Sequence, residues 1–414
     1  MEEIFITAIS LEKIRNLDHV MIPLSGSSRK HLILTGKNGS GKTTVLEALS
    51  KALDDLTSSE EQSMTEEMIS QLEKEYHEDI EKNPQIKKNL DTVRESKIIL
   101  QHGLSISFNC PLKMVYQAFT AGSFVIAYYK AERTFKAEVS RHVEKVELKK
   151  TYSPEESPRK DFVKYLVDMK VTQALAVSKN NTEKAEKIQK WFIDFERLLR
   201  RILENDQLTL NFDEDTFQFH LCEPQKEPYD FNTLSSGYAA ILDIVVDLIL
   251  RMEHHSNRRF QYDLPGIVLI DEIETHLHLE LQKKILDLLT TVFPNIQFIV
   301  SSHSPFILNS IDDAIIYDLE QKTLVQHGLS NVPYDGIVEG YFNANVLSEE
   351  LRTKFERYKT LVKKHSLTDD EIEEIMHLEL YLDEIPDYLA LDLTTEYKRL
   401  KLEYSAQEEE NGQN

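Results

Sequence analysis

The stretch LILTGKNGSGKTTVLEAL, residues 32–49, decides the fold. An apolar run ends in a segment with three glycines, after which a lysine and two threonines lead into an apolar-periodic stretch. This order predicts a strand, a glycine-rich turn and a helix. Glycines let the backbone curve round an anion, so that successive N–H groups point inward, and a helix N-terminus adds partial positive charge. The stretch therefore predicts a phosphate-binding loop.

The spacing within this loop matches the P-loop pattern G-x-x-x-x-G-K-[ST], with Gly36 and Gly41 as its glycines. In this pattern Lys42 reaches the β- and γ-phosphates and the Thr43 hydroxyl binds Mg²⁺. The sequence thus predicts ATP and Mg²⁺ as cofactors. The expected nucleotide contacts are Gly36, Lys37, Asn38, Gly39, Ser40, Gly41, Lys42, Thr43 and Thr44.

A second cluster lies in GIVLIDEIETHLH, residues 266–278. Its apolar run is typical of a strand in the middle of a parallel sheet, and the strand ends in Asp271 and Glu272. Two buried carboxylates need a partner, because burying unpaired charge is costly. With a P-loop upstream, Asp271 is expected to hold Mg²⁺ and Glu272 to orient the attacking water as a catalytic residue.

Two further segments are candidate parts of the site. In NIQFIVSSHSPFIL, residues 295–308, His303 follows a strand and is a candidate γ-phosphate sensor with a catalytic role, although such a histidine is more often an ordinary surface residue. In FNTLSSGYAAILDIVV, residues 231–246, Ser235, Ser236 and Gly237 precede a long apolar helix. These three residues fit either a plain N-cap or an exposed anion site.

The order of these four segments resembles that of ABC-type ATPases, in particular the OLD, RecF and SMC-like branch and the ATPase subunits of antiphage systems such as Septu or PARIS. The resemblance covers about 1–53 and 228–320. It implies an α/β fold: an ABC-type P-loop ATPase head with a mostly parallel central sheet, helical insertions and a helical C-terminal segment. It also implies that two subunits sandwich two ATP molecules head to tail. Ser235, Ser236 and Gly237 would then contact nucleotide held by the other subunit.

The chain departs from this family at several positions. Ser236 stands where the family usually has glycine, and Leu279 replaces a common proline. No Q-loop is evident. The segment YYKAERT, residues 128–134, resembles the arginine-bearing strand end of prokaryotic defence ATPases, which makes Arg133 a candidate for a place near phosphate.

Composition limits the class of protein. The 414 residues carry 48 Lys and Arg against 71 Asp and Glu, a net charge of −23, which argues against a broad basic surface for non-specific nucleic-acid binding but leaves room for a local basic groove. Two distant cysteines favour neither a disulfide framework nor a zinc site. There is no apolar run long enough to span a membrane and no signal-peptide pattern, so a cytoplasmic protein is expected.

The expected domains follow these patterns. The expected ATPase head comprises residues 1–53 and 208–330, with strands from 104–135. Two helical insertions are expected, at 54–103 and at 140–205, and the second forms an arm. A helical C-terminal region, 331–404, and a disordered tail, 405–414, follow. Residues 153–160, SPEESPRK, are expected to form an exposed loop.

Three functions remain open from the sequence. The preferred one is an ATPase that dimerises on ATP and regulates a separate effector, a nuclease or toxin, in antiphage defence. The alternative is a DNA-repair ATPase of the RecF or SMC type that clamps DNA itself, and a transporter ATPase is the weakest. No strand-borne acidic cluster of an OLD nuclease follows His303, so any cleavage is expected from the effector.

Overall fold

The computed structural model describes residues 3–58, 102–133, 135, 143–326, 328–329, 332, 336–337, 349–364, 367–383 and 391–411. The chain divides into two compact units, Met1–Asn331 and Val332–Asn414.

A six-stranded sheet is the centre of the first unit, with strand order β11-β10-β3-β9-β8-β5. All neighbouring strands pair in parallel except β11, which is antiparallel to β10 at the edge. Strands β3, β8 and β9 consist almost entirely of buried side chains, as expected of a parallel sheet covered on both faces. The strands are β3 (His31–Thr35), β5 (Val125–Tyr129), β8 (Gly266–Ile270), β9 (Ile296–Ser301), β10 (Ala314–Asp318) and β11 (Thr323–Val325).

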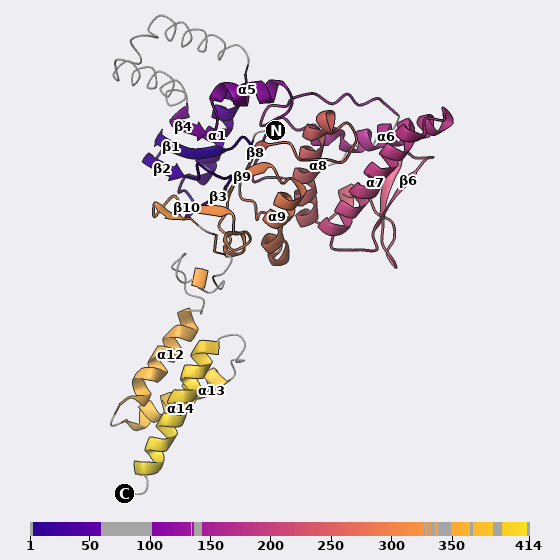
Figure 1. Cartoon of the computed structure of the whole chain (residues 1–414). Helices are drawn as coiled ribbons and strands as arrows, with labels where there is room; N and C mark the ends of the chain where they lie inside the picture. The colour runs from indigo at the N-terminus through magenta and orange to yellow at the C-terminus, as the bar shows by residue number, and fades with distance from the viewer. Residues whose placement is uncertain are drawn as a thin grey trace, which may run out of the picture. The chain divides into compact units, whose positions relative to one another are not determined.

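The helix that follows the P-loop, α1 (Lys42–Thr57), shares one apolar core with the central sheet and with a second, antiparallel sheet. The second sheet has the order β2-β1-β4, from β1 (Ile6–Ile14), β2 (Leu17–Pro23) and β4 (Leu104–Phe108). Alternate residues of the central strands, such as Leu32 and Leu34, belong to this core, because successive side chains of a strand point to opposite faces. The packing fixes the start of α1, and hence the P-loop, against the sheet (Figure 1).

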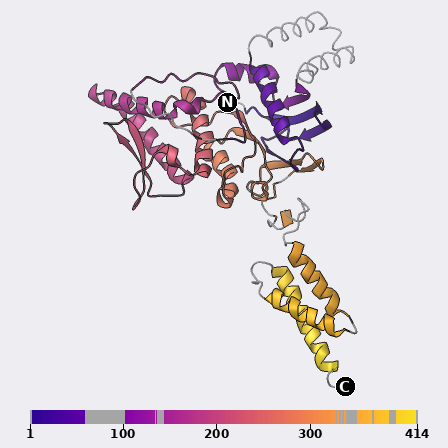
Figure 2. The same ribbon diagram turned by 180° about the vertical axis from the view of Figure 1, so that it is seen from behind.

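The long helix α8 (Ser236–Ser256) is buried over most of its length. It contacts β5, α9 (Leu279–Val292) and the helical pair α6 (Phe162–Ser178) and α7 (Thr182–Ile202). Helix α7 lies within the predicted helical insertion at 140–205, and its apolar stripe, which includes Trp191, Phe195 and Leu199, is buried. The helical pair and the hairpin β6 (Thr209–Asp213) and β7 (Gln218–Cys222) lie at the opposite end of this unit from the β2-β1-β4 sheet (Figures 1 and 2).

Part of the predicted helical arm is wrong. Residues 143–157 form no helix, and helix α6 starts only after a short 3₁₀ turn, Pro158–Asp161. The stretch expected to be an exposed loop instead buries Pro154 and Pro158, and the Pro154 carbonyl accepts a 2.8 Å hydrogen bond from the Tyr128 amide of β5. The segment thereby covers the free edge of the central sheet, where unpaired strand groups would otherwise be exposed.

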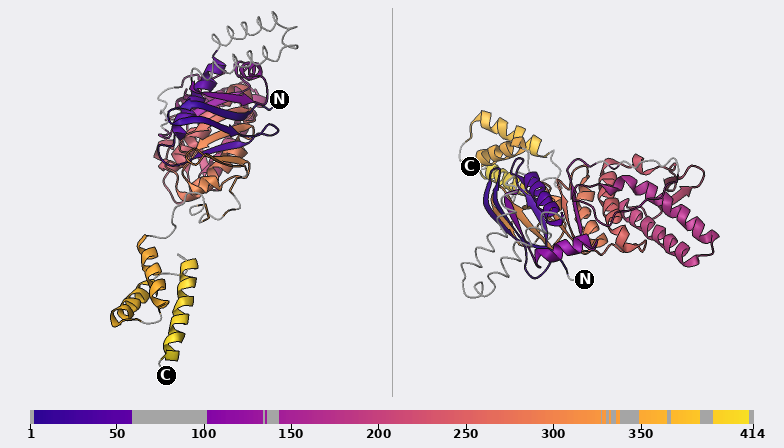
Figure 3. Two further views of the ribbon diagram at one scale, coloured as in Figure 1. Left: turned by 90° about the vertical axis from the view of Figure 1, so that its left-hand side faces the viewer. Right: turned by 90° about the horizontal axis from the view of Figure 1, so that it is seen from above.

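The second unit consists of three helices in the described residues: α12 (Glu349–Val362), α13 (Asp369–Asp383) and α14 (Leu391–Asn411) (Figure 3). They share a core that includes Phe355, Tyr358 and Tyr397. A capping box begins α13, since the Glu371 amide donates to Thr368 Oγ1 and the Thr368 amide donates to Glu371 Oε2. Helix α14 continues to Asn411, into the segment expected to be disordered, because its alanine, glutamine and glutamates favour helix.

Other predictions are only partly testable. Most of the expected insertion at 54–103 lies outside the described residues: residues 54–57 end helix α1, and residues 102–103 precede strand β4. Neither Cys110 nor Cys222 forms a disulfide, and both are half-buried. None of the described helices is long and apolar enough to cross a membrane.

Candidate functional site

Three of the four predicted site segments meet at one edge of the central sheet. The P-loop follows β3, Asp271 and Glu272 follow β8, and His303 follows β9, which lies between the other two strands. Because these strands are parallel, their carboxyl ends lie together, and this is the edge at which open α/β sheets bind ligands.

The P-loop backbone depends on its glycines. Gly36 has a φ of +127° and Gly41 a φ of +101°, conformations that other residues rarely adopt. A Cβ at Gly36 would also lie 2.9 Å from Ser40 Oγ. Lys42 is 6% exposed, and its Nζ donates to the carbonyls of Gly36 (2.8 Å) and Lys37 (3.2 Å). The loop therefore wraps round its own lysine.

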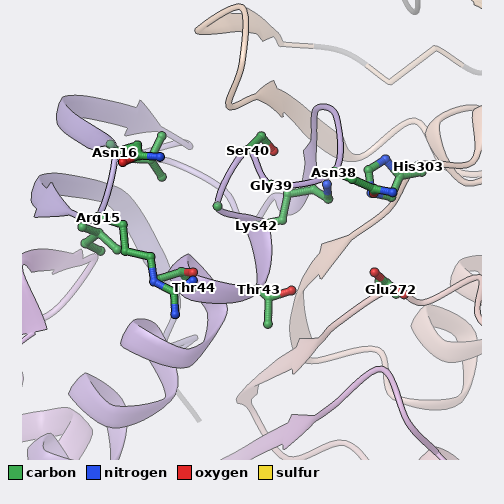
Figure 4. Close-up of a pocket in the computed structure, with 13 residues that line it drawn as sticks. Arg15, Asn16, Asn38, Gly39, Ser40, Lys42, Thr43, Thr44, Glu272 and His303 are labelled. Atoms are coloured by element: carbon green, nitrogen blue, oxygen red, sulfur yellow. The ribbon is translucent and has the colours of Figure 1, made fainter.

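A pocket of about 270 Å³ opens beside this loop. Figure 4 shows the P-loop between Glu272 and His303 on one side and Arg15 and Asn16 on the other. Of the predicted site residues, the lining includes Asn38, Gly39, Ser40, Gly41, Lys42, Thr43, Thr44, Glu272 and His303.

The sequence analysis missed Arg15 and Asn16. They form the turn between β1 and β2, and Arg15 has a φ of +50°. Only the packing of the second sheet against α1 brings this turn to the pocket, so their distance along the chain gave no sign of it. A polar pair in a tight turn between two apolar strands was the one available signal.

Ser301 holds the two carboxylate residues in place. Its hydroxyl donates to Asp271 Oδ1 over 2.6 Å and accepts a 2.7 Å hydrogen bond from the Glu272 amide. Glu272 has a φ of +43°, an unfavourable backbone conformation for a residue with a side chain. Asp271 is buried and does not line the pocket, whereas Glu272 does.

His303 is tied to the same loop. Its amide donates to Glu274 Oε1 over 2.6 Å, and its side chain lines the pocket. The other oxygen of this carboxylate, Glu274 Oε2, is buried without a hydrogen-bond partner among the described residues. A buried unpaired acceptor is costly and often marks a place where a ligand or partner group completes the site.

Burial and charge both act on the ionisable groups of the pocket. Burial lowers the pKa of Lys42, while the nearby carboxylates of Glu272, Glu274 and Asp271 oppose that change. Burial and the charge of Lys42 together lower the pKa of His303, which favours its neutral form. A neutral imidazole can accept a hydrogen bond as well as donate one.

Ser235, Ser236 and Gly237 do not line this pocket. The two serines are exposed at the start of α8, and the Ser235 side chain makes no capping hydrogen bond there. Gly237 is buried, and a Cβ at this position would lie 3.0 Å from the His276 carbonyl oxygen. Ser235, Ser236 and Gly237, called the signature segment below, thus present two serine hydroxyls to the surface. They lie outside the P-loop pocket of the same chain.

The expectation for Arg133 needs correction. Its side chain is 3% exposed and does not line the pocket. The guanidinium hydrogen bonds to backbone carbonyls, including that of Asp271 over 2.6 Å. Strand β5 pairs with β8, so the residues after it lie under the loop of Asp271 and Glu272 instead of beside the P-loop.

The residues present fit a magnesium nucleotide. Ser40 Oγ is buried with no hydrogen-bond partner among the described residues, beside a glycine-rich loop and a buried lysine. The described part of the chain has no group of three or more His, Cys, Asp or Glu side chains placed to hold a metal ion. Mg²⁺ in phosphate-transfer sites needs none, since it takes one or two protein oxygens together with phosphates and water.

Comparison with known proteins agrees with this geometry. Residues 133–309 match the family model described as "AAA domain, putative AbiEii toxin, Type IV TA system". The chain has the α/β fold of a P-loop ATPase, and over these residues it is similar to this AAA family.

Two curated proteins are similar to parts of this chain. The Septu protein PtuA of Bacillus mycoides (strain KBAB4) is 31% identical over 211 residues, which are 48% of this chain and 27% of the relative. The retron Ec83 probable ATPase of Escherichia coli is 37% identical over 134 residues, 31% of this chain and 25% of the relative. The aligned part thus spans about a quarter of the length of these relatives.

Among solved structures, this chain is similar to an SMC head bound to the C-winged helix domain of ScpA, with a TM-score of 0.38 and 13% identity. The aligned part covers 76% of this chain and 94% of that chain. The SMC head domain from Thermotoga maritima gives a TM-score of 0.36 and 12% identity, over 76% of this chain and 94% of that chain.

Proposed function

We propose that this chain binds ATP with Mg²⁺ and hydrolyses it to ADP and phosphate. The observation that carries the proposal is the convergence of Lys42, Thr43, Glu272 and His303 on one pocket at the carboxyl edge of a parallel sheet. Mg²⁺ bound there, by the Thr43 hydroxyl and Asp271, would neutralise charge on the phosphates.

The protein groups would act by position and charge. Lys42 would leave the loop carbonyls and stabilise the β- and γ-phosphate oxygens, and Glu272 would orient the attacking water. His303, neutral because its pKa is lowered, would donate to or accept from the γ-phosphate region. Arg15 and Asn16 lie across the P-loop from Glu272, so they would contact the nucleoside end of the ligand.

We further propose that two copies of the chain close head to tail on ATP. The support is the place of Ser235 and Ser236, which are exposed at the N-terminus of α8 and outside their own pocket. A helix N-terminus with free hydroxyls suits an anionic ligand held by another subunit.

The biological role we propose is regulation of a separate nuclease or toxin in antiphage defence. It rests on the similarity to a Septu protein and to a retron ATPase, together with the family resemblance in the motif order. A DNA-clamping ATPase is the alternative.

Two measurements test this function. The purified protein should release phosphate from ATP with Mg²⁺, and Lys42→Ala should abolish that release; the absence of Mg-dependent turnover in the wild type would contradict the proposal. In cells that carry the chain with its neighbouring genes, loss of phage protection on Lys42→Ala is expected. ATP-dependent retention on DNA without any such protection would favour the clamp.

A further inference from the structure

Arg133 lies directly below the loop that carries the two site carboxylates. The strand before it, β5, pairs with β8 from Val125 opposite Gly266 to Tyr129 opposite Ile270. The Asp271 amide continues this pairing by donating to the Tyr129 carbonyl over 2.8 Å. After these residues the two segments diverge, and the Arg133 side chain contacts the one that follows β8.

Its guanidinium donates to three consecutive carbonyls of that loop. Nη1 donates to the oxygen of Asp271 over 2.6 Å, and Nη2 donates to those of Glu272 (2.8 Å) and Ile273 (3.3 Å). Nη1 also donates to Lys130 within its own turn, over 3.1 Å. Of the guanidinium N–H groups of Arg133, only Nε–H has no acceptor among the described residues. The planar fork of arginine suits this set of carbonyls, which a single ammonium could not reach together.

The loop needs such a support because its backbone is strained. Glu272 has a φ of +43°, a conformation that is unfavourable for a non-glycine residue and persists only where its surroundings fix it. Ser301 holds the loop from β9 through the Glu272 amide, and Arg133 holds it from β5 through the carbonyls. The loop is thus fixed from two neighbouring strands.

Arg133 also has a charge partner on the signature helix. Asp243 of α8 is fully buried, and its negative charge opposes the lowering of the Arg133 pKa that burial causes. Asp243 in turn forms a 2.6 Å ion pair with Arg159. The guanidinium thus hydrogen bonds to the loop that presents Glu272, and the charge of Asp243 on α8 stabilises its charged form.

We propose that Arg133 is a positioning residue for ATP hydrolysis, which sets the orientation of Glu272 by fixing the carbonyls of residues 271–273. This inference rests on the proposed ATPase function. It assigns Arg133 no contact with nucleotide, because its side chain lies outside the pocket.

The test compares Arg133→Ala, Arg133→Lys and, as a matched control, Arg159→Lys. Arg159 is also paired with Asp243 but has no hydrogen bond to residues 271–273 in the described structure. Arg133→Ala is expected to lower kcat by about 10²-fold with KM for ATP within about twofold of the wild type, since a misplacement of about 1 Å has effects of that size. The kcat of Arg133→Lys should lie between those of Arg133→Ala and the wild type. Arg159→Lys should leave kcat unchanged.

Hydrogen exchange supplies a readout that does not depend on turnover. Exchange of the amides at 272–277 should rise at least tenfold in the Arg133 variants, with no change at the P-loop amides. If the wild type turns over no ATP, the proposed function fails, and this measurement still tests the support of the loop. Wild-type kcat in a folded Arg133→Ala protein would overturn the proposal. If Arg133→Ala does not fold, wild-type kcat in Arg133→Lys overturns it in the same way.

Discussion

The hydroxyl of Ser301, at the end of β9, donates a 2.6 Å hydrogen bond to Asp271 Oδ1, at the end of β8. The Ser301 hydroxyl oxygen also accepts a hydrogen bond from the Glu272 amide. One small side chain thus fixes both carboxylate residues against the neighbouring strand. The geometry of the proposed magnesium and water positions depends on a contact between strands that are about thirty residues apart in sequence.

Ser301→Ala should therefore damage the site more than the fold. It removes the donor to Asp271 and leaves the Glu272 amide unpaired, which costs about 1–3 kcal/mol of stability. We expect kcat to fall about tenfold or more, the effect of about 1.4 kcal/mol at the transition state. Steady-state ATPase rates measure this.

Ser302→Ala is the matched control for that change. Ser302 is buried like Ser301, but among the described residues its hydroxyl accepts a hydrogen bond only from the Ser304 amide in its own turn. Its kcat should stay within about twofold of the wild type. Equal loss of kcat in the two variants would contradict a special role of Ser301.

The head-to-tail arrangement predicts complementation between two inactive variants. Lys42→Ala removes the P-loop ammonium and Ser235→Arg blocks the surface of the signature segment, so each variant alone should be inactive. In a mixed pair one site keeps an intact P-loop and an intact signature segment. An equal mixture should regain up to about a quarter of wild-type turnover, because half of the random pairs are mixed and each has one good site. No recovery would show that Ser235 does not act across subunits.

His31 predicts how stability depends on pH. Burial, with a contribution from the charge of Arg29, lowers its pKa to about 4, and its Nδ1 accepts the Phe298 amide over 3.1 Å. Since the folded protein binds this proton less readily than the unfolded chain, the contribution to stability is full above pH 6.5 and is lost as pH falls toward 4. Between pH 7 and pH 5 this titration lowers the free energy of unfolding by about 2 kcal/mol.

The matching variant is His31→Asn, whose side-chain oxygen can still accept the Phe298 amide. Urea unfolding followed by the fluorescence of Trp191, the single tryptophan, measures the free energy of unfolding of the first unit. From pH 7 to pH 5 the free energy of unfolding of the wild type should fall by about 2 kcal/mol more than that of the variant. A parallel loss in both proteins would remove His31 as the cause.

The sequence predicted the parts of the fold that local pattern determines. The P-loop between β3 and α1, the buried strand before Asp271 and the apolar stripe of α7 all follow from spacing and periodicity within a single segment. Residues 143–157 were misassigned, because their buried Tyr152 and Pro154 follow the edge of β5 and have no helical period of their own.

The parts of the site that were missed depend on contacts between segments. Arg15 and Asn16 come to the pocket through the second sheet, and no pattern singled out Ser301 from the strand before His303. Arg133 was noticed but given the wrong neighbour, because the pairing of β5 with β8 decides its place. Strand order in a parallel sheet cannot be derived from the pattern of any one strand.

The most direct test of the central claim is the mass in solution of the Glu272→Gln protein with and without Mg-ATP. Glutamine should leave nucleotide binding intact and slow hydrolysis by about 10²–10⁴-fold, the usual contribution of a catalytic base. The account predicts that ATP with Mg²⁺ raises the mass to at least that of a pair, that removal of Mg²⁺ reverses the change, and that adding Lys42→Ala prevents it. An unchanged mass together with wild-type ATP turnover would contradict it.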